Sequence, residues 1–540
     1  MVGLVFFWQS LSPTLMPRSW VTQAAISAIC TAVGYVVGVF LGYLGHLVLR
    51  RLGWVPSPTV TRRAWEVVGL AAIVVVALGL VMWPYWQNDQ RELITLGDIS
   101  PALGIPMLLL TIVLFVVLGL LGRTVWKGIR ALDRFNRRHL PRAIASPVTV
   151  VLVLVLAVLL VRDVAFDAFT SWANSAFSAS DKGTPEGIEP PTSPTVSGSP
   201  ASLAPWDTLG YEGRRFVATA TTADQLRAFH GADATTDEPV RVYVGLRSAD
   251  SLEERAALAV RELDRTGAWD RDVLAVVTVT GTGWVDPDAA RSLEQLHAGN
   301  TAMVAMQYSY LPSWISFLTD RDKAADAGAA LFTAVHERWL ELPEDERPQL
   351  VAFGLSLGSY GAEAAFASRD AASSVANLVA RTDGALLVGP TNSNPIWSQI
   401  TADREPGSPY WRPVYDGGTT VRFNNRPSDA TLDDPAWRAP RVLYVQHPSD
   451  PVAFWSMDTL WSPPGWMDRP RGYDVPSQGY WFPFVTWTQS VFDLMAGFSA
   501  PPGFGHDYAP NYVAAWAQVA PVDGWTDDDT ARLEAFLFAP

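Results

Sequence analysis

The pentapeptide Gly354-Leu355-Ser356-Leu357-Gly358 stands between an apolar run, 350–353, and a small-residue segment with helical character, 359–366. A strand, a tight turn that carries a serine, and a helix together form a nucleophile elbow. Glycines two residues before and after the serine leave room for the sharp turn, and the helix start offers a backbone N–H to an oxyanion. The stretch therefore predicts a nucleophilic Ser356 at the end of a buried strand, although such patterns also occur in ordinary loops.

Short apolar runs alternate with amphipathic or alanine-rich segments on both sides of this pentapeptide. The apolar runs are 241–246, 273–279, 302–307, 350–353, 385–388 and 442–446, and the helical segments include 251–265, 286–297 and 322–341. Buried runs that alternate with helices are typical of a doubly wound α/β sheet with right-handed crossovers. We therefore expect residues 206–540 to form an α/β domain with a mostly parallel sheet.

The composition divides the chain of 540 residues into two contrasting parts. Residues 1–170 carry a net charge of +7 and the remainder carries −21. A chain of this length is expected to form more than one domain. The single cysteine, Cys30, lies in an apolar run, which excludes a disulfide framework or a cysteine metal site within one chain. No metal and no organic cofactor is expected.

The N-terminal part contains four long apolar stretches with almost no charge, near 20–49, 65–83, 105–122 and 146–161. Each approaches the roughly 20 residues that cross a hydrocarbon core. Buried helices of a soluble protein are disfavoured, because such helices normally show a polar face. We expect a polytopic transmembrane domain of about four helices over 1–170. The opening run 1–7 is too short to span, and would be an interfacial segment or the tail of a further span.

The loops between the predicted spans differ in charge. Four arginines stand in the first loop and seven basic residues in the third, whereas the second has only Arg91 beside acidic residues. Lys and Arg accumulate on the cytoplasmic side. The chain is therefore predicted to be a multi-pass plasma-membrane protein whose part after about residue 165 is extracytoplasmic. A basic loop between spans is an ordinary topological signal, so nucleic-acid binding is not expected.

Two further segments have distinctive compositions. Residues 171–205 are rich in Pro, Ser, Thr and Gly and are predicted to be a solvated linker. The segment near 454–500 is rich in Trp, Tyr and Phe with prolines between them, and is predicted to form a cap on the α/β domain. Its rings would suit a lipid chain or a membrane interface, or would pack the core of the cap itself.

A serine nucleophile needs a histidine base and an acid that orients the base. Asp450 follows the predicted strand 442–446, and His506 lies in a glycine-rich loop near the chain end. The order Ser, Asp, His is the one found on this kind of sheet. We therefore predict the triad Ser356, Asp450 and His506, with His447 as a reserve base. The other histidines fall in the membrane domain or precede the elbow: His46, His139, His230, His297 and His336.

Two parts of the predicted site are less sharply defined. Other acids lie in the same region as Asp450, namely Asp433, Asp434, Asp474 and Asp507. The oxyanion hole should combine the N–H of Leu357 with one from a loop after an earlier strand. The loop 280–284 has the glycines that allow a close approach of backbone to substrate, and within it we predict Thr282 and Gly283 as donors.

Several stretches together resemble an actinobacterial family of membrane-anchored α/β-hydrolases. They are 11–13 with 17–20, 207–214, 280–284, 307–314 and the elbow, and they spread over nearly the entire chain. The resemblance implies an envelope protein with a polytopic N-terminal region and a C-terminal hydrolase domain.

The functional expectation follows from these features. A membrane tether, an aromatic segment and a serine triad favour an esterase, lipase or acyltransferase that acts on an acyl ester of the cell envelope, with a lipid ester as the expected substrate. The alternative is an envelope scaffold or transport-associated membrane protein that carries the fold without turnover. A peptidase would use the same triad and fits the apolar setting less well.

Overall fold

The structure is a computed structural model that describes residues 1–53, 57–159, 167–319, 321–429, 432, 434 and 436–538. These residues form two compact units. The first unit comprises 1–169 and 455–501, and the second comprises 170–454 and 502–540. The first unit is therefore built from two segments that are far apart in the sequence.

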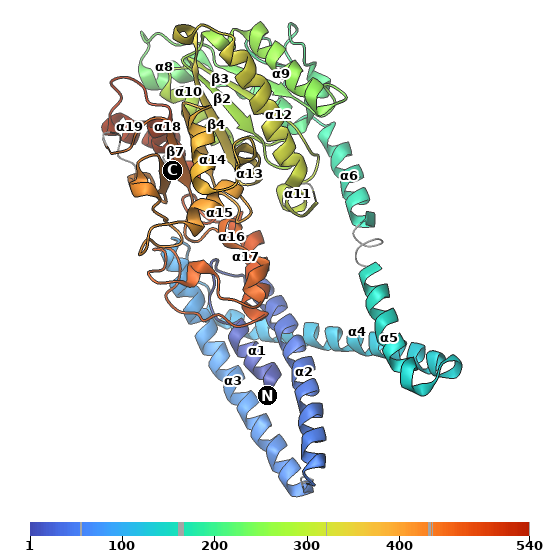
Figure 1. The fold of residues 1–540 in the computed structure, drawn as a ribbon. Coiled ribbons are helices and arrows are strands. Elements are labelled where there is room, and N and C mark those ends of the chain that lie inside the picture. The colour runs from blue at the N-terminus through green and yellow to red at the C-terminus, as the bar shows by residue number, and fades with distance from the viewer. Residues whose placement is uncertain are drawn as a thin grey trace. The chain divides into compact units, whose positions relative to one another are not determined.

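The first unit is helical among its described residues, and its three longest described helices are α2, α3 and α4, drawn in blue to cyan in Figure 1. Its helices are α1 (Val2–Ser10), α2 (Trp20–Arg51), α3 (Pro58–Leu93), α4 (Gly104–His139), α5 (Arg142–Leu159) and α17 (Val485–Gly497). Three stretches, Trp20–Arg51, Pro58–Leu93 and Pro101–His139, are long and apolar enough to cross a membrane. These match three of the four predicted spans.

The fourth predicted span and the opening run form shorter helices than the other three predicted spans. The described part of the fourth predicted span forms α5, a shorter apolar helix, and residues 160 and 161 lie outside the described residues. The opening run forms α1, which packs along α2. A side chain at Gly34 of α2 would overlap Phe6 of α1, so a glycine there allows the two helices to approach closely.

The segment 455–501 packs within the first unit. Val485 of α17 forms a cluster with Ile26 and Cys30 of α2, and Phe6 of α1 packs against the same cluster. The sequence placed this aromatic-rich segment as a cap on the α/β domain, whereas the structure groups it with the N-terminal helices. Pattern alone could not show this, because the contacts join residues more than 450 positions apart.

The second unit is built on one parallel sheet of seven strands among the described residues. The strand order is β1-β3-β2-β4-β5-β7-β6, and each neighbouring pair is parallel. The strands are β1 (Val240–Val244), β2 (Val273–Thr278), β3 (Thr301–Met306), β4 (Gln349–Leu355), β5 (Gly384–Val388), β6 (Val421–Asn424) and β7 (Arg441–Val445). The predicted α/β fold with a mostly parallel sheet is confirmed.

Two layers of helices cover this sheet. One contains α9 (Leu252–Thr266), α12 (Arg321–Leu340) and α13 (Leu357–Ala364), and another contains α10 (Pro287–Leu296) and α18 (Tyr512–Val519). The other helices are α7 (Gly210–Ala218), α8 (Ala223–His230), α11 (Ser313–Thr319), α14 (Ala371–Val379), α15 (Pro395–Ala402), α16 (Pro451–Phe454) and α19 (Asp527–Phe538), while α6 (Asp167–Asp181) crosses the boundary between the units. The strands are almost completely buried, as their continuous apolar runs predict.

The predicted linker is partly structured. Its first residues continue α6, which ends at Asp181. Val196 forms an isolated parallel bridge with Arg241 of β1, and the Ser197 hydroxyl donates to a carboxylate oxygen of Glu262 on α9 at 2.9 Å. Val196 and Ser197 are both buried. This part of the segment therefore packs against the sheet rather than extending into solvent.

Candidate active site

The elbow has the strained geometry that its glycines suggested. Ser356 stands between β4 and α13 with φ 57° and ψ −125°, a region that non-glycine residues rarely adopt. Its N–H donates to the carbonyl of Val388 at the end of β5, at 2.9 Å. A Cβ at Gly354 would overlap the carbonyl of Gly358, and one at Gly358 would overlap the carbonyl of Thr278. Both glycines are therefore required for the turn.

The predicted acid and base are in contact. His506 Nδ1 lies 2.7 Å from Asp450 Oδ2, and both side chains are buried. The same carboxylate oxygen accepts from the Tyr508 hydroxyl at 2.6 Å, while Oδ1 accepts from the N–H of Val452 at 2.8 Å. Asp450 follows β7 and directly precedes α16. A carboxylate held by these donors can fix both the orientation and the tautomer of an imidazole.

The serine and the histidine both lie at the carboxyl end of β5. Val388 accepts the N–H of Ser356, and the next residue, Gly389, lies against the ring of His506 so closely that a Cβ would overlap it. Gly389 in turn donates its N–H to Val445 on β7 at 2.8 Å. Neighbouring residues of one strand end thus link the elbow to the acid–base pair, at the sheet edge where sites of α/β folds form.

His447, the reserve base, packs as a structural residue. Its Nδ1 lies 3.0 Å from the carbonyl of Gly505, and its Nε2 lies 3.1 Å from Oδ1 of Asn511. The ring stacks on Tyr508, with centroids 4.2 Å apart. Burial lowers the pKa of His447 below its usual range. These contacts support the loop that carries His506 and leave His447 less suited to accept a proton from Ser356.

The alternative acids are placed elsewhere. Asp434 pairs with Arg422 at 2.7 Å, and this bond lowers the pKa of the carboxyl. Asp507 caps the next turn through the N–H of Ala509 at 3.2 Å. Asp474 belongs to the first unit, and Asp433 lies outside the described residues. Among the described candidates, Asp450 is the acid that contacts His506.

The histidines before the elbow have local packing roles. His230 Nε2 lies 2.7 Å from the carbonyl of Gln295, and His297 Nε2 lies 3.1 Å from the carbonyl of Ala520. Burial lowers the pKa of His297 to about 4. His336 stacks on two aromatic rings of its own helix, α12. All three histidines therefore make local packing contacts away from the elbow.

The predicted oxyanion donors are in two different places. Leu357 is the first residue of α13, where a backbone N–H has no carbonyl four residues earlier to bind. The N–H of Gly283 donates within its own turn to the carbonyl of Thr280 at 2.7 Å, and the carbonyl of Thr282 accepts from Gln307, just after β3, at 2.9 Å. Leu357 is thus beside the serine, whereas Gly283 is committed to the loop in this conformation.

A buried polar network lies beneath the elbow. The Ser359 hydroxyl donates to the carbonyl of Ser356 at 2.7 Å and accepts from Asn394 Nδ2 at 3.1 Å. The same amide donates to Glu363 Oε1 at 2.9 Å, which also accepts from the Tyr444 hydroxyl at 2.8 Å. Two backbone N–H groups of α15 donate to Glu363 Oε2. Burial raises the pKa of Glu363 to about 7.

Sequence reasoning did not find Tyr508, Ser359, Asn394 or Glu363. Tyr508 follows His506 by two residues, and Glu363 lies seven residues after the nucleophile on the face of α13 that turns inward. A glutamate buried on a helix of small residues is a usable signal, because buried carboxylates need partners. The partners themselves come from distant strands and helices and leave no local pattern.

Two other features lie apart from this site. A cavity of about 230 Å³ lies against β6 and is lined by residues including Arg412, Arg422, Trp437 and Gln518. Within the described part of the chain, no group of three His, Cys, Asp or Glu side chains could hold a metal ion.

Comparisons with known proteins agree with the expected combination of domains. Residues 240–533 match the model of an alpha/beta-hydrolase family, and residues 11–220 match the model of an alpha/beta-hydrolase family N-terminus. No match was found among curated proteins or among solved structures. The predicted family resemblance is confirmed, and an actinobacterial source stays a prediction.

Proposed function

The chain belongs to the alpha/beta-hydrolase family, and from this membership and the site geometry we propose that it is a membrane-anchored serine hydrolase. It acts through an acyl-enzyme on an ester, with a lipid of the cell envelope as the preferred substrate class. The acyl group passes to water, as in an esterase or lipase, or to a second alcohol, as in an acyltransferase.

One observation carries the proposal. A serine with φ 57° stands between two glycines that nothing larger could replace, at the strand end that also contacts a histidine bonded to a buried aspartate. Strained backbone of this kind persists where the surrounding structure enforces it, and it is common at reactive residues. A structural turn would not need an imidazole–carboxylate pair at the same edge of the sheet.

The proposed chemistry assigns one role to each residue. Ser356 Oγ attacks the ester carbonyl, and its proton passes to Nε2 of His506. Asp450 accepts the hydrogen bond from His506 Nδ1 and stabilises the imidazolium that forms. The N–H of Leu357 donates to the oxyanion, with Thr282 as the proposed second donor. His506 then protonates the leaving alcohol, and water or another alcohol releases the acyl group by the reverse steps.

The substrate class rests on the setting of the enzyme. Three helices long and apolar enough to cross a membrane precede the α/β unit. The charges of the predicted loops favour an extracytoplasmic α/β unit, tethered to the outer face of the plasma membrane. An enzyme held there meets envelope lipids at high local concentration. The aromatic side chains near 454–500 supply apolar surface suited to acyl chains.

A fluorophosphonate probe tests the proposal, because it reacts with activated serines. The full-length protein in membranes should be labelled, and labelling should be lost in Ser356→Ala and fall by orders of magnitude in His506→Gln and Asp450→Asn. His336→Gln, which changes a histidine on α12 outside the site, is the matched control and should be labelled like the wild type. Hydrolysis of lipid esters would then be compared with transfer to added alcohols.

A folded wild-type protein that resists the probe would contradict the proposal. It would favour the alternative of an envelope scaffold or transport-associated protein that keeps the fold without turnover. An envelope phenotype that survives Ser356→Ala would point in the same direction.

A further inference from the structure

Helix α17 buries its polar side chains, whereas most of its apolar side chains are only partly buried or exposed. All five of its polar residues are buried: Thr486, Thr488, Gln489, Ser490 and Asp493. The exposed position within the helix is occupied by Met495, which is 63% exposed, and Phe498 directly after the helix is 51% exposed. A helix at the surface of a water-soluble domain has the opposite arrangement.

Three apolar residues of α17 and its C-cap residue, Phe498, form one stripe. Trp487, Val491, Leu494 and Phe498 follow one another at spacings of four, three and four residues, which places them on one face of a helix. None of the four is fully buried. Gln489 and Asp493 fall on the opposite side of the helix. The polar side chains of α17 thus face the protein and the apolar stripe faces outward, as in a helix with an apolar environment.

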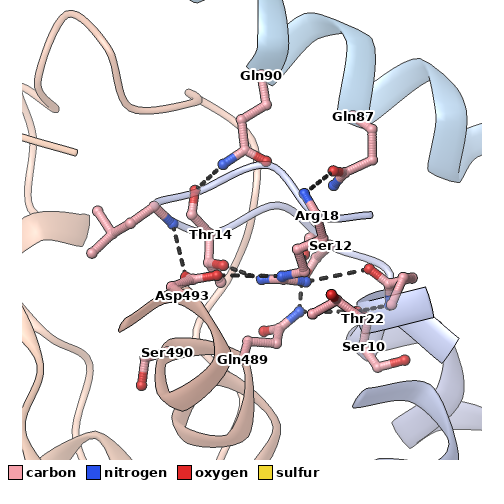
Figure 2. Close-up of polar contacts among 12 residues, drawn as sticks. Ser10, Ser12, Thr14, Arg18, Thr22, Gln87, Gln90, Gln489, Ser490 and Asp493 are labelled. Carbon is pink, nitrogen blue, oxygen red and sulfur yellow. Dashed lines mark hydrogen bonds and ion pairs between the residues drawn. The ribbon is translucent and has the colours of Figure 1, made fainter. Parts of the chain in front are cut away.

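The polar face of α17 is tied to the N-terminal loop by a buried ion pair, which Figure 2 shows in close-up. Arg18 Nε lies 3.3 Å from Asp493 Oδ1, and both side chains are at most 1% exposed. Asp493 Oδ2 accepts the N–H of Leu15 at 3.2 Å, and the Arg18 guanidinium also donates to Thr14. Burying two charges is costly unless they are paired and hydrogen-bonded, as they are here.

Further amides extend this network to other helices (Figure 2). Gln489 Nε2 donates to the carbonyls of Ser10 and Ser12, at 3.0 and 2.9 Å. Gln87 Oε1 on α3 accepts the N–H of Arg18 at 2.6 Å, and Gln90 Nε2 donates to a carbonyl of the same loop at 2.8 Å. The polar face of α17 thus lies against the loop 11–19, which α3 also holds, and it is fixed within the first unit.

Helices α2 and α3 show the same reversed sorting near this network. Gln23 and Ser27 of α2 and Gln87 of α3 are fully buried, whereas apolar residues farther along both helices are exposed, for example Val39 at 55%. Buried polar and exposed apolar side chains are what helices surrounded by lipid display. Because α17 shows the same distribution of polar and apolar side chains and belongs to the same hydrogen-bond network, we infer that it is also surrounded by lipid.

The contacts between α17 and α2 indicate where α17 would lie relative to the hydrocarbon core of a bilayer. Arg50 and Arg51 mark one end of the apolar stretch of α2, and a hydrocarbon core takes about 20 residues, or about 30 Å. Counting back that length from the arginines reaches about Cys30. Val485 at the start of α17 packs against Cys30 and Ile26. The helix therefore begins at the boundary between the hydrocarbon core and the headgroups.

We propose that α17 is a membrane-interfacial helix, whose polar face is docked on the N-terminal helices and whose apolar stripe contacts the lipids of the adjacent leaflet. The segment 455–501 would then be a fixed part of the membrane anchor, although it follows most of the α/β unit in the sequence. This inference rests on the membrane location in the proposed function and is independent of catalysis.

Site-directed fluorescence in lipid nanodiscs tests it. Cys30 is the only cysteine of the chain and is buried, so the wild type provides an unlabelled background. Single cysteines replace Met495 and Phe498 in the full-length protein and carry an environment-sensitive fluorophore. Quenching by nitroxide-labelled phosphatidylcholine is compared with quenching by iodide in the water. Val39→Cys on α2 is the control for lipid, and Leu340→Cys, 48% exposed on α12, is the control for water.

The expected result is that lipid quenching at 495 and 498, like that at position 39, exceeds quenching at position 340 several-fold, with little iodide quenching. If position 39 is quenched by lipid while 495 and 498 respond to iodide like position 340, the proposal is overturned and the membrane location stands. Shielding of 495 and 498 from both quenchers would assign the face to a protein contact, and would also overturn it. Absence of lipid quenching at position 39 would refute the membrane location itself.

Discussion

Replacing Glu363 by glutamine tests the buried network beneath the elbow. The carboxylate accepts from Asn394, from Tyr444 and from two backbone N–H groups of α15, and it is fully buried. Burial raises its pKa from 4.5 to about 7 in the folded protein. Because the folded state holds the proton more tightly than the unfolded state, protonation stabilises the fold. This stabilisation is complete below about pH 4.5 and is lost as the pH rises through about 7.

The size of the effect follows from the two pKa values. Between pH 5 and pH 8 the wild type should lose roughly 2–3 kcal/mol of folding free energy at this one group. Glutamine does not titrate, so the Glu363→Gln variant should not lose this folding free energy as the pH rises. Its NH₂ group would face one of the N–H donors, which costs about 1–3 kcal/mol at every pH. The variant should therefore be less stable than the wild type throughout this range, and by a larger margin at pH 5 than at pH 8.

Thermal unfolding of the full-length protein in nanodiscs, followed by tryptophan fluorescence between pH 5 and pH 8, measures this gap. For a unit of about 320 residues, a loss of roughly 2–3 kcal/mol corresponds to a shift of the unfolding midpoint by about 3–4 °C. The midpoint difference between Glu363→Gln and wild type should shrink by that amount over the range. Glu344→Gln, at an exposed glutamate, is the control and should follow the wild type. A gap that stays constant with pH would refute the reasoning.

Three further predictions concern the site and the anchor. Tyr508→Phe removes a 2.6 Å hydrogen bond to Asp450 and should slow probe labelling about tenfold, from about 1.5 kcal/mol, without loss of folding; an unchanged rate would exclude a role for the hydroxyl. Gly358→Ala should abolish labelling, because the added Cβ would overlap the carbonyl of Thr278 at the end of β2, and normal labelling would contradict the described turn. Arg18→Met leaves Asp493 buried and unpaired and should cost about 3–5 kcal/mol of stability. The double variant Arg18→Met/Asp493→Leu should recover much of this lost stability. If the stability losses of the two single variants simply add in the double variant, the ion pair between Arg18 and Asp493 is contradicted.

Much of the fold could be predicted because its signals are local. The buried strands are continuous apolar runs, and six predicted strands correspond to β1 to β5 and β7. The missed strand, β6, has only four residues, Val421–Asn424, two of them polar, and it pairs at the edge of the sheet. Such a strand depends on its neighbour β7 more than on its own composition. The sequence pattern therefore identified the centre of the sheet and the edge strand β1, and missed the opposite edge strand, β6.

The candidate site also contains residues that the sequence predicted and residues that it did not. Glycine spacing identified Ser356, and chain order with strand position singled out Asp450 and His506, which the structure brings into contact with each other. The supporting residues, such as Tyr508 and Glu363, become visible only when distant strand ends are brought together. Of the two donors predicted in the loop 280–284, Gly283 uses its N–H within the loop's own turn, a bond that the glycine pattern does not indicate, and Thr282 stays a proposal.

The Arg18–Asp493 pair has a consequence for the order in which the protein matures. Its partners are separated by 475 residues. At synthesis rates of about 5–20 residues per second, roughly 24–95 s pass between the appearance of the arginine and that of its aspartate. During that interval the first helices have already left the ribosome, while the guanidinium has no carboxylate to meet. The first unit is thus completed only after most of the α/β unit has been synthesised, and its early helices must wait for a segment that arrives after the elbow serine.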